Sequence, residues 1–180
     1  MHASNTKWLK QRGLMLFVLF ALHLTVSGLS AQGISITKVQ NLSFGAFSQG
    51  NAGGTITVSN SGERSATGAV IPLNLGIQYF QAAFDVEAPA GTIISISNGA
   101  DATLRGSKGG SMPLQIGNSD VGSPFITTAS GKTRVNIGGT LSVGSPSANP
   151  PDAYSGSFYI TLTKSKLLPP NEPHLSIFKH

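Results

Sequence analysis

The chain of 180 residues contains no cysteine, which excludes disulfide bonds, thiolate metal ligands and cysteine nucleophiles. Histidine is nearly as scarce. His2 and His23 lie near the N-terminus, and His174 and His180 lie near the C-terminus. The long stretch between His23 and His174 therefore cannot contain a Ser-His-Asp triad or a histidine-based metal site.

Charge is also sparse, at 11% of residues against about 25% in ordinary soluble domains. The chain has 12 Lys and Arg against 7 Asp and Glu. Three of the basic residues, Lys7, Lys10 and Arg12, precede an apolar run at the N-terminus. The others are scattered, whereas a nucleic-acid-binding surface gathers basic side chains on one face. We expect no nucleic-acid partner.

Residues 1–31 have the pattern of a secretory signal. The basic residues are followed by the apolar run 13–22 and then by small residues up to Ala31. Cleavage is expected after Ala31 or, alternatively, after Ser30. The run is shorter than the roughly 20 residues that a membrane-spanning helix needs. The pattern thus predicts export to the periplasm, outer surface or surroundings of a Gram-negative bacterium, with no membrane span after cleavage.

The remaining sequence is rich in glycine (22 in the whole chain) and alternates apolar and polar residues with a period of two. Such alternation predicts strands with one buried face. The expected inward residues are Ile34, Ile36, Ile56, Val58, Phe80, Ala82, Phe84, Val86, Val135, Ile137, Leu141 and Val143. Strands separated by short turns without helices favour a single antiparallel β-sandwich. We assign it to residues 32–163, followed by a proline-containing extended tail, residues 164–180.

The last expected strand runs from Tyr154 to Thr163. Phe158 and Ile160 should be core residues, whereas Tyr159 and Thr161 should point away. Residues 99–131 carry the weakest pattern, and we interpret pieces such as Met112–Ile116 there as edge strands and loops.

One internal likeness stands out, between Gly53-Gly-Thr-Ile-Thr-Val58 and Gly138-Gly-Thr-Leu-Ser-Val143. It is interpreted as two hairpin turns that each lead into a buried strand. The alternative is a duplicated β unit.

The acidic residues offer little chemistry. Asp85 and Glu87 are two apart on one strand, roughly 6.5–7 Å from each other, a separation that would suit a glycosidase pair. Asp85, however, falls on the polar face, where carboxylates are usually solvated. Asp101 and Asp120 are expected to form turns, and Arg64 to hydrogen-bond a neighbouring turn. We assign no catalytic, cofactor-binding or metal-binding residue and expect no enzyme.

Several pieces, in this order, resemble a bacterial domain-of-unknown-function family numbered 4402. They are Leu42-Ser-Phe-Gly-Ala-Phe47, Gly53–Val58 with Gly62 and Arg64, Ala82-Ala-Phe-Asp-Val86, Ile137–Val143 and Tyr154-Ser-Gly-Ser-Phe-Tyr-Ile-Thr161. Asp152-Ala153 departs from the usual Gly and Thr. The resemblance implies secretion and an immunoglobulin-like sandwich whose closing strand is similar to that of pilus subunits. It brings no catalytic residues.

Two functions follow as hypotheses. The first is a structural surface protein, such as a fibre, pilus-like or coat subunit, which would self-associate or bind protein partners. The second is a secreted module that holds a carbohydrate or protein in loops such as 99–131. An open apolar groove between edge strands would favour the first function. Either Ile34–Val39 or His174–Lys179 could pair with a neighbour's sheet, unless residues 34–39 are simply the first strand of their own domain.

Export has a direct test. N-terminal sequencing of the protein made in a Gram-negative host should begin at Ala31 or Gln32, because cleavage removes the signal. Recovery of intact Met1 in the processed pool would contradict the prediction.

Overall fold

The computed structural model describes residues 33–128 and 131–165, and every regular element in these two ranges is a β-strand. The strands are β1 (Ser35–Gln40), β2 (Ser43–Phe44), β3 (Phe47–Val58), β4 (Arg64–Pro72), β5 (Tyr79–Phe80), β6 (Ala82–Ala88), β7 (Ile93–Asn98), β8 (Ala102–Gly106), β9 (Ser111–Ser119), β10 (Phe125–Ile126), β11 (Gly131–Val143), β12 (Tyr154–Ser155) and β13 (Ile160–Lys164). No helix of a length and apolarity suited to crossing a membrane occurs among these residues.

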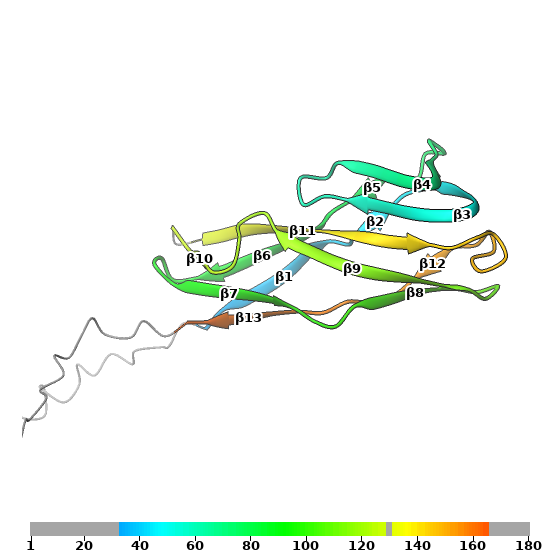
Figure 1. Cartoon of the computed structure of the whole chain (residues 1–180). Helices are drawn as coiled ribbons and strands as arrows, with labels where there is room; N and C mark the ends of the chain where they lie inside the picture. The colour runs from blue at the N-terminus through cyan, green and yellow to red at the C-terminus, as the bar shows by residue number, and fades with distance from the viewer. Residues whose placement is uncertain (1–32, 129–130, 166–180) are drawn as a thin grey trace, which may run out of the picture. The chain divides into compact units, whose positions relative to one another are not determined.

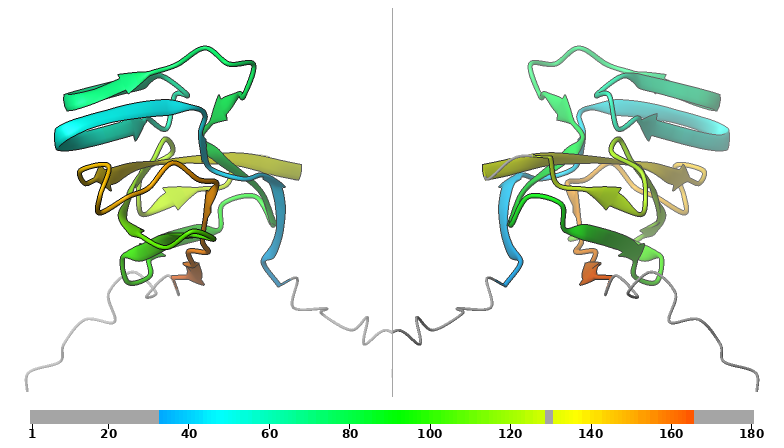
Figure 2. Two further views of the ribbon diagram at one scale, coloured as in Figure 1. Left: turned by 90° about the vertical axis from the view of Figure 1, so that its right-hand side faces the viewer. Right: turned by 90° about the vertical axis from the view of Figure 1, so that its left-hand side faces the viewer.

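All strand pairs are antiparallel and form three sheets (Figure 1). The largest has the order β1-β6-β11-β9-β8-β12, with β3 also paired to β11 and β4 paired to β3. The others are β10-β7-β13 and β2-β5. Side views show β3 and β4 above β11, with β7 and β13 below it (Figure 2). The large sheet thus curls around the core, and the prediction of an all-β, antiparallel fold is confirmed.

The central strand β11 holds two different partners on one edge. Its first half pairs with β6, up to Ile137 opposite Ala82. Its second half pairs with β3, beginning at Gly139 opposite Val58. The other edge of β11 is occupied by β9. Gly138 lies at the point where β11 changes partner from β6 to β3. It contacts the carbonyl oxygen of Val58, and a Cβ atom on residue 138 would overlap that oxygen. Only glycine lets the end of β3 approach so closely.

The internal likeness noted in the sequence has a structural basis. Gly53–Val58 and Gly138–Val143 pair with each other, and Ile56 lies opposite Leu141 at the centre. The two segments are therefore related by a local two-fold axis, so that residues at equivalent positions have similar surroundings. Ile56 and Leu141 are both buried, and the hydroxyls of Thr57 and Thr140 lie 2.9 Å apart. Gly53 meets the Val143 carbonyl as Gly138 meets that of Val58.

Most of the expected inward residues form the core. Buried side chains among those predicted are Ile56, Val58, Ala82, Val86, Val135, Ile137, Leu141 and Val143. Two of the expected inward side chains are not buried, because Phe80 is 40% exposed and Ile36, although it shares a face with buried Val86, is 45% exposed. Ile36 lies on β1, an edge strand that no neighbour covers from its free side. Phe80 lies on β5, a two-residue strand that pairs only with β2.

The predicted last strand is divided in two. β12 pairs with β8, and β13 pairs with β7. The predicted phase is confirmed, because Phe158 and Ile160 pack against the core while Tyr159 and Thr161 are exposed. Phe158 and Ile160 are nevertheless only half-buried, because the sheet stays open beside them.

The interpretation of Met112–Ile116 as an edge or loop segment was wrong. These residues lie in β9, between β11 and β8, and Met112, Leu114 and Ile116 are all buried. Pro113 lies within this strand although proline cannot donate a hydrogen bond to a ladder. The alternation of the surrounding residues was the better guide.

The contact at Gly138 predicts a large mutational effect. Gly138→Ala should lower the free energy of unfolding by about 3 kcal/mol, because a Cβ forced into a packed backbone displaces it. Gly33→Ala is the control, since nothing lies within 4 Å of that position, and it should change stability by less than about 0.5 kcal/mol. Urea unfolding measures both. Equal stability of the two variants would contradict the steric role of Gly138.

Candidate functional site

The two neighbouring carboxylates on β6 are engaged in ion pairs. Asp85 and Glu87 lie directly opposite Arg134 and Lys132 of β11. The Arg134 Nε atom lies 2.6 Å from Asp85 Oδ1, and the Lys132 Nζ atom lies 3.5 Å from Glu87 Oε1. These are cross-strand charge pairs of the kind that support a sheet. The structure therefore places both residues on its surface as structural partners of β11.

Asp120 also has a structural role, as predicted. Its two carboxylate oxygens accept hydrogen bonds from the backbone N–H and the side-chain amide of Asn136, both at 2.7 Å. Asp101 is exposed in the connection between β7 and β8. Among the described residues, no three His, Cys, Asp or Glu side chains gather closely enough to hold a metal ion.

The main concave feature is an opening lined by apolar side chains. One part, of about 720 Å³, lies between the segments 42–49 and 73–77 on one side and 146–154 on the other. Leu104, Met112 and Leu141 contribute to its lining. The two walls come from parts of the chain that are far apart in sequence.

A second part, of about 480 Å³, continues toward β1. Its walls are the end of β1 with residues 40–42, and the segment 154–158 that leads into β13. Its lining is mixed, because Ala82, Phe84 and Leu114 contribute apolar side chains while Lys38, Gln40, Asn41, Ser155 and Ser157 contribute polar ones. The two parts share Leu42, Phe44, Leu104 and Tyr154. We call these two adjoining openings together the apolar groove.

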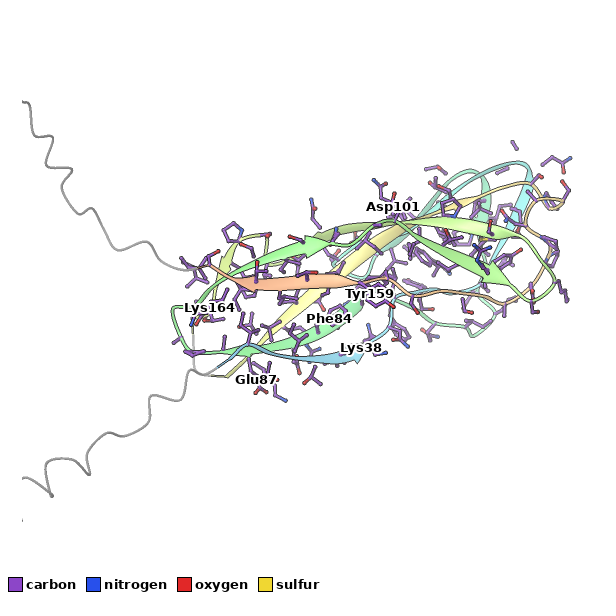
Figure 3. The ribbon with its side chains drawn as sticks, turned by 90° about the horizontal axis from the view of Figure 1, so that it is seen from below. Lys38, Phe84, Glu87, Asp101, Tyr159 and Lys164 are labelled. Carbon is purple, nitrogen blue, oxygen red and sulfur yellow. The ribbon has the colours of Figure 1, made fainter. Side chains whose placement is uncertain are left out.

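The end of β1 and the segment that leads into β13 line the groove, and each of these two strands has one edge without a partner among the described residues. β1 pairs only with β6, and β13 pairs only with β7. Seen from below, Phe84 lies between β13 and β1 (Figure 3). Ile36 and Lys38 stand opposite Val86 and Phe84 in the register, so their side chains share the inner face of the sheet. Lys38 lines the groove, and Ile36 lies two residues away on the same face of β1.

Arg64 holds one wall of the groove in place. Its Nη1 atom donates to the carbonyl oxygens of Phe44 (3.1 Å) and Ala46 (3.2 Å), and Nη2 donates to that of Leu73 (3.4 Å). The guanidinium also lies 4.3 Å from the centre of the Tyr79 ring, a favourable cation–π distance. The prediction that Arg64 hydrogen-bonds a neighbouring turn is confirmed. The residues that accept these bonds form part of the wall of the groove.

Gly45 belongs to the same arrangement. Its backbone has φ +67°, and a Cβ there would lie 2.7 Å from Arg64 Nη1. The left-handed conformation and the close guanidinium both require glycine.

The opposite wall is held by Asp152. Its carboxylate accepts hydrogen bonds from the Lys108 N–H (2.6 Å), the Ser107 hydroxyl (2.9 Å) and the Ala153 N–H (2.8 Å). The bond from the Lys108 backbone is the main reason that the pKa of Asp152 lies below its ordinary value. Ionised Asp152 therefore stabilises this loop above the unfolded-state pKa, and the contribution is lost as pH falls through the lower folded-state pKa.

Tyr154 and Asn149 complete that wall. The Tyr154 hydroxyl donates to the Pro150 carbonyl at 2.8 Å, and burial raises the pKa of this phenol. The buried Asn149 side chain accepts from the Gly144 N–H (2.6 Å) and donates to the Ser111 carbonyl (2.8 Å). These hydrogen bonds thus hold in place the wall whose apolar side chains line the groove.

Sequence reasoning found part of this site. Leu42, Phe44 and Phe47 belong to a segment noted for its resemblance, and Arg64 was singled out. Leu75 and Ile77 were missed, although their alternation with polar residues and glycine before Tyr79 is a usable signal. The loops proposed for binding, 99–131, contribute only Leu104, Met112 and Leu114 to the groove lining.

The fold and the groove define an all-β, antiparallel domain with an opening beside the end of β1 and the segment that leads into β13. Residues 34–163 match the family described as Domain of unknown function (DUF4402), and the chain belongs to that family. No curated protein and no solved structure matches it.

The role of Arg64 can be tested by replacement. Arg64→Met should lower the free energy of unfolding by about 2 kcal/mol, since charge-assisted hydrogen bonds contribute about 1.5–3 kcal/mol each and this side chain is partly solvated. Hydrogen exchange should speed up in residues 42–47 and 73–79. Arg105→Met, at an exposed site on β8, is the control and should leave both measurements unchanged. Equal exchange in the two variants would contradict the role of Arg64.

Proposed function

We propose that this protein is an exported structural protein of the bacterial surface, a subunit whose apolar groove receives an extended segment of a protein neighbour. The observation that carries the proposal is the groove between the end of β1 and the segment that leads into β13, two strands that each have an edge without a partner among the described residues. In this proposal the domain is an immunoglobulin-like sandwich in which one strand position is open.

The physical argument rests on the backbone of the two edges. An unpaired edge offers N–H and C=O groups to any extended chain, and proteins normally cover or blunt such edges. A segment laid between β1 and β13 would gain main-chain hydrogen bonds, while alternate side chains would enter the apolar lining. It would also cover Ile36 and Val39, which are 45% and 48% exposed.

The basic side chain on the inner face limits what can pair there. Lys38 faces the groove from β1, and an inward-pointing charge on an edge strand discourages indiscriminate pairing. The groove is therefore suited to a selected segment, which is what an ordered assembly requires.

A second candidate function is the binding of a small apolar molecule. The larger part of the groove, about 720 Å³, falls in the range of small-molecule sites. Its lining is mainly aliphatic, which favours an apolar ligand over a carbohydrate. The loop-based alternative has lost its aromatic residue, because Phe125 is buried in the core. We propose no enzymatic role.

Two adjacent substitutions on β1 test the structural proposal. Ile36→Lys places a second charge on the inner face, whereas Thr37→Lys places it on the outer face, opposite Asp85. Both residues are exposed, so the fold should survive both changes. Sedimentation of the secreted chain should show assemblies for the wild type and Thr37→Lys, with association at least tenfold weaker for Ile36→Lys.

Three results would count against the proposal. The first is a wild-type protein that stays monomeric at every concentration and binds no protein from the surface fraction of its own bacterium. The second is equal assembly of the two variants. The third is stoichiometric binding of an apolar dye or fatty acid to the groove with no assembly, which would favour the small-molecule function instead.

A further inference from the structure

We infer that the segment which fills the apolar groove of one copy is His174–Lys179 of a second copy. This inference rests on the proposed function and names its partner. It begins from the requirements of the groove, which are an extended conformation, apolar side chains at alternate positions and free backbone groups along both sides.

The N-terminal candidate is already used. Residues Ser35–Gln40 form β1 and pair with β6 of the same domain, from Ser35 opposite Glu87 to Gln40 opposite Ala83. The expectation that residues 34–39 are the first strand of their own domain is thereby confirmed. β1 cannot also serve a neighbour as the inserted strand. It offers its free edge to the groove and is therefore part of the receptor.

The C-terminal stretch has the pattern that the groove requires. The sequence continues for 15 residues beyond Ser165, which lie outside the described structure. Within them, Leu175 and Ile177 alternate with Ser176, and the run 175–178 carries no charge. As a strand, Leu175 and Ile177 would share one face. At about 3.3 Å per residue, His174–Lys179 would extend about 20 Å, the length of the six residues of β1.

The spacer before this stretch directs it to a second copy. β13 ends at Lys164, six residues past Phe158, the last residue in the sequence that lines the groove, so a return onto the groove of its own domain needs a reversal of the chain. Pro169, Pro170 and Pro173 instead favour an extended polyproline conformation. At about 3.1 Å per residue, residues 166–173 then span about 25 Å. That reach carries His174–Lys179 away from its own groove and toward a neighbour's.

Insertion of this kind would join copies head to tail. Each copy would give its C-terminal stretch to one neighbour and receive another in its groove. Such heterologous contacts produce open filaments when the rotation between copies does not close a ring. A fibre or coat is the corresponding product.

The test separates donor from receptor. In a chain that begins at Gln32, deletion of residues 166–180 removes the donor and keeps the groove, whereas Ile36→Lys blocks the groove and keeps the donor. Each variant alone should sediment as a monomer, and an equal mixture should give a one-to-one complex. The full chain should form larger, concentration-dependent species. Circular dichroism and thermal unfolding establish that each variant is folded.

A point substitution and a peptide serve as controls for indirect effects of deleting residues 166–180. Full-length Ile177→Asp should associate at least tenfold more weakly than wild type, while Ser176→Ala should associate normally. A fluorescent peptide of residues 171–180 should bind the tail-deleted chain, and its Ile177→Asp version should not.

The possible results distinguish a failure of this inference from a failure of the proposed function. If the tail-deleted chain still assembles and Ile36→Lys does not, the inserted segment lies elsewhere, and the inference fails while the proposed function stands. If the full chain is monomeric and residues 175–178 are protected from hydrogen exchange, the stretch fills its own groove, which also overturns the inference. If neither change affects assembly, both fail.

Discussion

The close backbone contact at Gly138 is the constraint on which the arrangement of the sheet depends. A strand edge can hold one partner at each position, yet β11 pairs with β6 and then with β3 along the same edge. This change of partner from β6 to β3 requires the end of β3 to lie directly against β11, and only a residue without a side chain permits such close contact. From that point β3–β4 and β6–β1 extend in different directions (Figure 1). Both parts contribute to the walls of the apolar groove.

The groove combines a fixed lining with unpaired edges. Arg64 secures one wall through three carbonyl oxygens, and Asp152 with Asn149 secures the other. A preformed receptor loses little conformational entropy when a segment binds, so more of the gain from new hydrogen bonds and buried apolar surface appears as affinity. Charges on the outer face are meanwhile paired across β6 and β11. The molecule thus has paired charges on one face of the large sheet and the groove on the other.

Much of this could be predicted from the sequence, for a local reason. Alternation places Ile56, Val58, Val135 and Ile137 on buried faces, because neighbouring side chains on a strand point to opposite sides of the sheet. Arg64 was expected to hydrogen-bond a neighbouring turn, and its guanidinium, which carries five donors, does bond three carbonyl oxygens. Where prediction failed, the cause was the position of a strand within its sheet. Ile36 alternates as well as Ile56 does, yet β1 lies at an edge and β3 does not.

The sequence by itself determined the strand content, the phase of nearly every strand, the lack of histidine and cysteine chemistry in the domain, and the family. These features depend on residue identity and on contacts between near neighbours. Only the tertiary structure decided which strands are central, where β11 changes partner and which edges stay open. The groove depends on pairings between residues as distant as Lys38 with Phe84 and Tyr154 with Gly106. Such pairings depend on which strands meet in the folded chain, and no local pattern encodes that choice.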